Sequence, residues 1–111
     1  MEVKALNFLQ KDIVEYDDFF LSCEVFICPK VEQFTYDVYS FNVISLKRLY
    51  NTFEDNGIMM NKGWMIMKYY DELVIKEEVE RIVEKCNKEK AIEFWINIST
   101  YLRKQDSDGT I

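Results

Sequence analysis

Histidine is absent from the 111-residue sequence, and glycine and proline together fill only four positions. Without histidine the chain cannot form Ser-His-Asp or Cys-His nucleophilic centres, and it lacks the usual general base near neutral pH and the commonest zinc ligand. Three glycines do not supply a phosphate-binding glycine loop. These absences favour a binding protein over an enzyme, and we expect no catalytic residue, no cofactor and no metal site.

Long apolar runs and an even cysteine count are also missing. No run approaches the ~20 residues that span a bilayer, and Met1–Lys4 shows no basic stretch leading into an apolar one, so we expect no signal peptide. Cys23, Cys28 and Cys86 are an odd set. Because Cys23 and Cys28 differ by five positions, they would point to opposite faces of one strand and not pair. We predict reduced thiols in a cytoplasmic protein.

Apolar and acidic residues are what the chain does contain. Hydrophobic residues make up 49% and charged residues 31%, which excludes a disordered chain and is enough for one core. With no repeat and no linker, we expect one domain over residues 1–104 and a frayed polar tail over residues 105–111. The net charge of −6 repels phosphate backbones and argues against nucleic-acid binding.

Alternating apolar residues predict four strands, at Val3–Phe8, Phe20–Ile27, Gln33–Ile44 and Gly63–Tyr70, with an acidic loop at Lys11–Asp18. The second strand has Leu21, Cys23, Val25 and Ile27 on one face, and Pro29 ends it because proline has no amide hydrogen to donate to a neighbouring strand. In the third strand the apolar positions change from even to odd, which predicts a bulge or strong twist near Val38–Tyr39. The fourth segment is almost continuously apolar, which is typical of a central strand covered on both faces.

Apolar residues three and four positions apart predict three helices. A short helix follows Ser45, which can cap it, and carries Leu46, Leu49, Tyr50 and Phe53 on one face. A long helix has the stripe Ile75, Val79, Ile82, Val83 and Cys86. A last helix from about Glu89 to Arg103 has the stripe Ala91, Phe94 or Trp95, Ile98 and Leu102. We therefore predict an α+β fold: an antiparallel sheet of about four strands with a short helix and two C-terminal helices packed on one face.

Charge is unevenly distributed along the chain. Residues 1–56 hold ten acidic and five basic residues, a net charge of −5, whereas residues 57–111 hold ten and nine, a net charge of −1. An acidic strand half would attract a basic protein partner and speed its association, although the same charge also serves solubility. Tyrosines among carboxylates are common at interfaces. The candidate contact residues are Glu15, Tyr16, Asp17, Asp18, Glu24, Glu32, Tyr36 and Asp37.

Two alternatives remain open at this stage. Tyr36 and Tyr39 are also explained as ordinary strand residues, one of which faces the core, and the helical half, with Glu78 and Glu84, is the next candidate surface.

The middle and C-terminal parts of the chain resemble a known family. A strand runs into a short helix (Phe41–Leu49), a second strand follows a turn (Gly63–Asp71), and an amphipathic helix (Ile75–Cys86) precedes a final helix with Trp95 and Leu102. Over residues 34–104 this succession is similar to the eighth immunity-protein family of bacterial polymorphic toxin systems, which includes contact-dependent growth inhibition systems. The polar segment Gln105–Ile111 departs from the family, in which a further aromatic segment often follows.

The resemblance implies a cytoplasmic, non-enzymatic protein that binds one cognate toxin domain, one to one, and contacts neither nucleic acid nor membrane. Such toxins are frequently nucleases such as RNases. A nuclease active site is basic because its substrate is a polyanion, so an acidic inhibitor can cover it. Two other classes stay open: an acidic adaptor or nucleic-acid mimic that regulates a DNA-binding protein, and a small enzyme that uses carboxylates alone.

Overall fold

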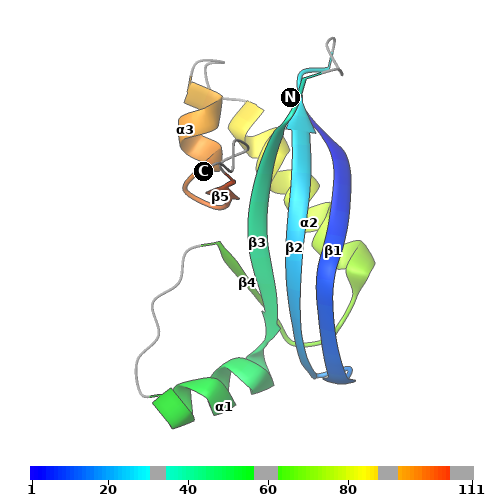
Figure 1. The fold of residues 1–111 in the computed structure, drawn as a ribbon, viewed down its shortest axis with the longest axis vertical. Helices are drawn as coiled ribbons and strands as arrows, with labels where there is room; N and C mark the ends of the chain where they lie inside the picture. The colour runs from blue at the N-terminus through cyan, green and yellow to red at the C-terminus, as the bar shows by residue number, and fades with distance from the viewer. Residues whose placement is uncertain (31–34, 57–62, 88–92, 106–111) are drawn as a thin grey trace.

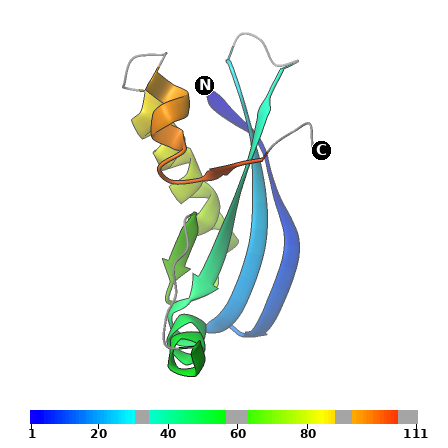
Figure 2. The ribbon, with the colours of Figure 1, turned by 60° about the vertical axis from the view of Figure 1, so that its left-hand side comes forward.

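Residues 1–30, 35–56, 63–87 and 93–105 are described in a computed structural model, and they form five strands and three helices. The strands are β1 (Glu2–Glu15), β2 (Asp18–Cys28), β3 (Asp37–Ser45), β4 (Trp64–Met67) and β5 (Arg103–Lys104); the helices are α1 (Leu46–Asn56), α2 (Glu72–Asn87) and α3 (Phe94–Ile98). Helices α2 and α3 lie on one side of the sheet and α1 lies at its lower end (Figure 1, Figure 2). The predicted α+β class, with both C-terminal helices on one face, is confirmed.

The sheet is mixed. Its order is β1-β2-β3-β4, and β5 pairs with β3 as well. The pairs β1–β2, β2–β3 and β3–β5 are antiparallel, but β3 and β4 are parallel. A helix, α1, follows β3 directly, and such a crossover lets the next strand run in the same direction. The sheet is therefore mostly antiparallel, as predicted, with one parallel pair at its edge.

Strand β1 is much longer than predicted and takes in most of the expected loop at Lys11–Asp18. Its pairing with β2 shifts by one residue at three places, between Val3 and Ala5, between Phe8 and Gln10, and between Ile13 and Glu15. Each shift is a bulge, and a bulge moves the core-facing position by one residue. The apolar residues of β1 therefore do not alternate with period two, which is why the sequence pattern hid its second half.

Strand β3 pairs with β2 in one unbroken register, so of the predicted bulge or strong twist near Val38–Tyr39 the bulge is wrong. The odd-numbered residues Tyr39 to Val43 face the core and are buried. Tyr36 precedes the strand, and its ring stacks on Phe26 with centroids 4.8 Å apart. The apparent change of phase therefore came partly from a residue outside the strand. The predicted beginning at Gln33 lies outside the described residues.

Strand β4 is an edge strand of four residues, and its predicted place at the centre of the sheet is wrong. Met65 and Met67 pack against the core, whereas Ile66 on the other face is 53% exposed. The apolar run in the sequence is longer than the strand because Tyr69 and Tyr70 follow β4 outside the sheet, where their rings contact Tyr16 and Phe19.

The core lies between the sheet and helices α2 and α3. The predicted inner face of β2 and the predicted stripe of α2 are buried, as are three residues of the last stripe; these are Leu21, Cys23, Val25, Ile27, Ile75, Val79, Ile82, Val83, Cys86, Phe94, Ile98 and Leu102. Helix α3 ends at Ile98, earlier than predicted, and a turn leads into β5. The predicted start of this helix, with Ala91, lies outside the described residues.

Cys23, Cys28 and Cys86 are buried and are not joined in disulfides, as predicted for reduced thiols. Burial raises the pKa of the Cys23 thiol to about 12, so this side chain stays protonated at neutral pH. None of the helices in the described ranges has the length and apolarity to cross a membrane.

Candidate interaction surface

The predicted contact residues do not form one cluster. Glu15–Asp18 make the turn between β1 and β2, Glu24 lies in the middle of β2 on the face away from the helices, and Tyr36 and Asp37 lie at the other end of the sheet. Glu32 lies outside the described residues. Asp37 pairs with Ile27, nine residues along β2 from Asp18, which corresponds to about 30 Å at 3.3 Å per residue. The structure brings together only the four residues of the turn.

Ser45 and Arg48 fix α1 to this turn. The Ser45 hydroxyl accepts hydrogen bonds from the backbone amide of Arg48 at 3.1 Å and from that of Phe19 at 3.2 Å. The predicted helix cap is therefore confirmed, and the same oxygen joins α1 to β2. The Arg48 guanidinium donates from Nε to Asp18 at 2.7 Å and from Nη1 to Asp12 at 2.8 Å. These hydrogen bonds raise the pKa of Arg48, and the one to Asp18 has the larger effect.

Two more of the predicted carboxylates have a cation beside them. Lys47 Nζ lies 3.7 Å from Asp17, and Lys104 Nζ lies 3.8 Å from Asp37. Glu15 is exposed and forms no ion pair with another described residue. The charge of −5 that residues 1–56 carry is therefore not concentrated at the β1–β2 turn, because α1 supplies two cations to it.

A groove of about 480 Å³ opens between the β1–β2 turn, α1 and the residues after β4. We call it the tyrosine groove; it is lined by Tyr16, Asp17, Leu46, Lys47, Tyr50, Asn51, Lys68 and Tyr69. Its four large apolar residues are between 47% and 64% exposed. The Tyr16 ring stacks on Tyr69 with centroids 5.3 Å apart, and the Tyr16 carbonyl accepts a hydrogen bond from the amide of Tyr70 at 2.7 Å. These two contacts order one wall of the groove in the free protein.

The predicted apolar face of α1 does not pack on the core. Leu46, Tyr50 and Phe53 are at least half exposed, and Leu49 is half-buried. The stripe in the sequence shows that the helix has an apolar face, but it does not show whether that face meets this chain or another one. Leu46, Tyr50 and Tyr69 are therefore contact candidates that sequence reasoning missed, because it assigned the first two to internal packing.

Helix α2 carries several exposed carboxylates. Three exposed glutamates on this helix make no ion pair with another described residue; they are Glu77, Glu80 and Glu84. Glu78 is paired with Arg81, and its hydrogen bonds from Arg81 lower the pKa of Glu78. Residues 57–111 carry nearly equal numbers of acidic and basic residues. Helix α2 nevertheless presents acidic side chains that form no ion pair with the described cations.

The end of the molecule that holds the β1–β2 turn and α1 presents exposed aromatic rings beside charged side chains. This is the composition of protein contact surfaces, where tyrosine supplies a large area and a polar tip. Within the part of the chain that the structure describes, no group of three or more cysteine, aspartate or glutamate side chains is placed to hold a metal ion.

Comparison with known proteins identifies the family. The family model for immunity protein 8 matches residues 1–105, so it takes in β1 and β2 as well as the region over which the resemblance was seen. Searches of curated proteins and of solved structures return no match. Because the family match spans nearly the whole chain, the chain belongs to the immunity protein 8 family and is an immunity protein of a polymorphic toxin system.

Proposed function

We propose that the chain binds its cognate toxin through the tyrosine groove and the β1–β2 turn, and that this toxin is a nuclease. The observation that carries the proposal is the concentration of exposed apolar side chains at one end of the molecule: Tyr16, Leu46, Tyr50, Phe53 and Tyr69. Burying a large apolar side chain contributes about 2 kcal/mol. A partner that covers this end therefore gains far more than one that covers an ordinary polar surface.

The preformed geometry of the groove supports the same surface. Arg48 and Ser45 hold α1 against the turn, and the Tyr16–Tyr69 stack holds the opposite wall. A surface that is already ordered loses little conformational freedom on binding. Asp17 lines the groove and Glu15 ends β1 at the same turn, so this proposal keeps the four predicted residues of the turn and leaves out Glu24, Tyr36 and Asp37.

The nuclease part of the proposal rests on charge. The chain carries a net charge of −6, and Glu15, Glu77, Glu80 and Glu84 have no cationic partner among the described residues. A nuclease presents a basic active site to its polyanionic substrate, and an acidic partner approaches such a site faster than a neutral one. Three cysteines outside disulfides suit the reducing cytoplasm, where a delivered nuclease meets its substrate.

Co-expression tests the binding and the nuclease parts separately. The tagged chain is produced with the toxin domain encoded by the neighbouring reading frame, purified, and assayed for cleavage of RNA and DNA. We expect a one-to-one complex, and we expect the free toxin to cleave nucleic acid while the complex does not. Failure of the toxin to co-purify contradicts the binding proposal. A toxin that is captured but cuts neither RNA nor DNA contradicts the nuclease part alone.

A charge reversal tests the electrostatic approach. Glu15→Lys is the cleanest variant, because Asp18 also holds Arg48 and its replacement would disturb the position of α1. We expect Glu15→Lys to slow association with the toxin, to leave dissociation nearly unchanged, and to lose its effect as salt rises. Glu2→Lys at the other end of β1 controls for the change in net charge. Equal association rates for wild type and Glu15→Lys at low salt would show that the turn does not face the basic site.

A further inference from the structure

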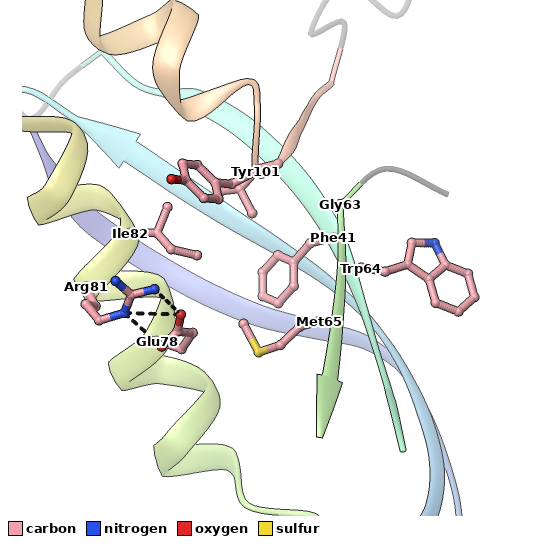
Figure 3. A pocket seen from close by; sticks show the side chains of 9 residues that line it. Phe41, Gly63, Trp64, Met65, Glu78, Arg81, Ile82 and Tyr101 are labelled. Atoms are coloured by element: carbon pink, nitrogen blue, oxygen red, sulfur yellow. Dashed lines mark hydrogen bonds and ion pairs between the residues drawn. The ribbon is translucent and has the colours of Figure 1, made fainter. Parts of the chain in front are cut away.

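A pocket separate from the tyrosine groove lies between α2, the start of β4 and the turn after α3 (Figure 3). Its volume is about 200 Å³. Phe41, Ile82 and Leu102 line it and are themselves buried. Met65 points into the pocket from β4, whereas the Trp64 ring points to the opposite side of the strand (Figure 3). The floor of this pocket is therefore apolar and already packed.

The charged side chains that line the pocket, Glu78 and Arg81, are bonded to each other. Arg81 Nε lies 3.0 Å from one Glu78 oxygen, and Arg81 Nη2 lies 2.5 Å from the other. Both residues extend from α2 at the mouth of the pocket (Figure 3). A charged group that entered would leave water for an apolar floor and would find the lining charges already engaged with each other, which is strongly unfavourable. An uncharged occupant has no such penalty.

We infer that this pocket receives one apolar side chain of the cognate toxin, of the size of leucine, methionine or phenylalanine. A cavity of about 150 Å³ lined by aliphatic and aromatic side chains takes up benzene, so about 200 Å³ accommodates one ring or one branched chain. An apolar, desolvated floor inside a polar rim is the usual surrounding of a residue that dominates a protein interface. This inference rests on the proposed function, because the occupant belongs to the toxin.

Strand β4 connects the pocket to the tyrosine groove. Met65 near its start lines the pocket, and Lys68 and Tyr69 immediately after it line the groove. Four residues of strand span about 13 Å. A protein interface of ordinary size buries about 800 Å² on each partner, a patch roughly 30 Å across. The separation between the groove and the pocket is therefore within the span of one toxin interface.

Two neighbouring methionines provide a matched pair of variants. Met65 and Met67 lie on the same face of β4, are both half-buried and both pack against the core. Met65 lines the pocket and Met67 does not. We expect Met65→Phe, which places a larger and more rigid side chain in the pocket, to weaken toxin binding at least tenfold, and Met67→Phe to change it less than twofold. The thermal unfolding of both variants is measured alongside, so that a loss of folding is not read as a loss of binding.

A substitution on the toxin side keeps the inference testable if Met65→Phe does not fold. With the wild-type chain as the binder, each exposed apolar residue of the toxin is replaced by alanine in turn. We expect one of these substitutions to weaken binding at least tenfold with the wild-type chain, and to have little additional effect in a complex with Met65→Ala, whose smaller side chain does not crowd the fold, because both changes remove the same contact. If no apolar toxin residue has such an effect, the inference is wrong.

The outcomes separate this inference from the proposed function. A wild-type chain that does not bind the toxin contradicts the proposed function. A wild-type chain that binds, together with a Met65→Phe variant that binds within twofold of it, contradicts the pocket inference and leaves the proposed function standing. If the wild-type chain self-associates in sedimentation and Met65→Phe abolishes this, the occupant is a second copy of the chain and the inference is also overturned.

Discussion

Replacing Arg48 with alanine removes the contact that holds α1 against the β1–β2 turn. The side chains of Arg48 and Asp18 are 21% and 22% exposed, whereas Asp12 is 58% exposed. A hydrogen bond to a charged group contributes about 2 kcal/mol when it is largely shielded from water, and an exposed ion pair contributes about 0.5 kcal/mol. We therefore expect Arg48→Ala to lower the free energy of unfolding by about 2.5 kcal/mol.

Urea denaturation followed by tryptophan fluorescence measures this loss. In thermal unfolding of a chain of this size, a change of about 4 °C in Tm corresponds to 1 kcal/mol, so the Tm should fall by about 10 °C. Arg48→Lys should recover less than half of the loss, because one ammonium group cannot bond both carboxylates in the geometry of a guanidinium. Since Tyr50 and Leu46 lie on the helix that Arg48 fixes, toxin affinity should fall as well.

Arg81→Ala is the matched control. Arg81 also bonds a carboxylate, that of Glu78, but the two side chains are 59% and 36% exposed and lie on one helix surface. The expected loss is about 0.5 kcal/mol. Equal destabilisation by Arg48→Ala and Arg81→Ala would refute the role assigned to Arg48. Additive effects of Arg48→Ala and Asp18→Ala would refute it too, because a shared contact requires them not to be additive.

Three further predictions concern stability and reactivity. Hydrogen bonds from Lys11 and Tyr70 lower the pKa of Glu72. The ionised Glu72 carboxylate therefore stabilises the fold fully above the unfolded-state pKa of about 4.3, and this stabilisation is lost as the pH falls through the lower folded-state pKa. Urea titrations between about pH 5 and pH 3 should accordingly show a smaller loss of stability in Glu72→Gln than in the wild type. Gly63 has φ +74°, and an added Cβ there would lie 3.3 Å from Arg103 Cγ, so Gly63→Ala should lose about 1–2 kcal/mol and Gly63→Asn less, because asparagine tolerates this region better. A thiol reagent at pH 8 should label none of the three buried cysteines in the native chain and all three after denaturation, and rapid labelling of the native protein would show that the core opens.

The sequence pattern predicted elements whose apolar face meets this chain's own core. The stripe of α2 and the inner face of β2 are buried at every predicted position, because an unbroken period of 3.6 or 2 leaves one consistent face. The pattern failed for β1, where three bulges shift that face. It failed again for α1, whose stripe is genuine but is left exposed at Leu46, Tyr50 and Phe53.

The candidate surface was predicted only in part, because the sequence pattern does not show which distant residues the fold brings together. Composition placed acid and tyrosine near Tyr16 and Asp17, and the structure adds the partners that a linear count does not contain. Lys47 and Arg48 are about 30 positions from the aspartates that they contact, so charge summed over chain segments does not give charge on a surface. Tyr69 reaches Tyr16 only through the fold.

Calorimetric titration of the cognate toxin domain into three forms of the chain tests the toxin-binding surface most directly. The forms are the wild type, Tyr50→Ala in the tyrosine groove, and Tyr36→Ala at the far end of the sheet; both tyrosines are exposed, at 64% and 47%. We predict one-to-one binding, a loss of affinity of about 30-fold for Tyr50→Ala, as expected when an anchoring aromatic residue is removed, and an unchanged affinity for Tyr36→Ala. A loss confined to Tyr36→Ala, or equal affinities for all three forms, would contradict binding through the tyrosine groove.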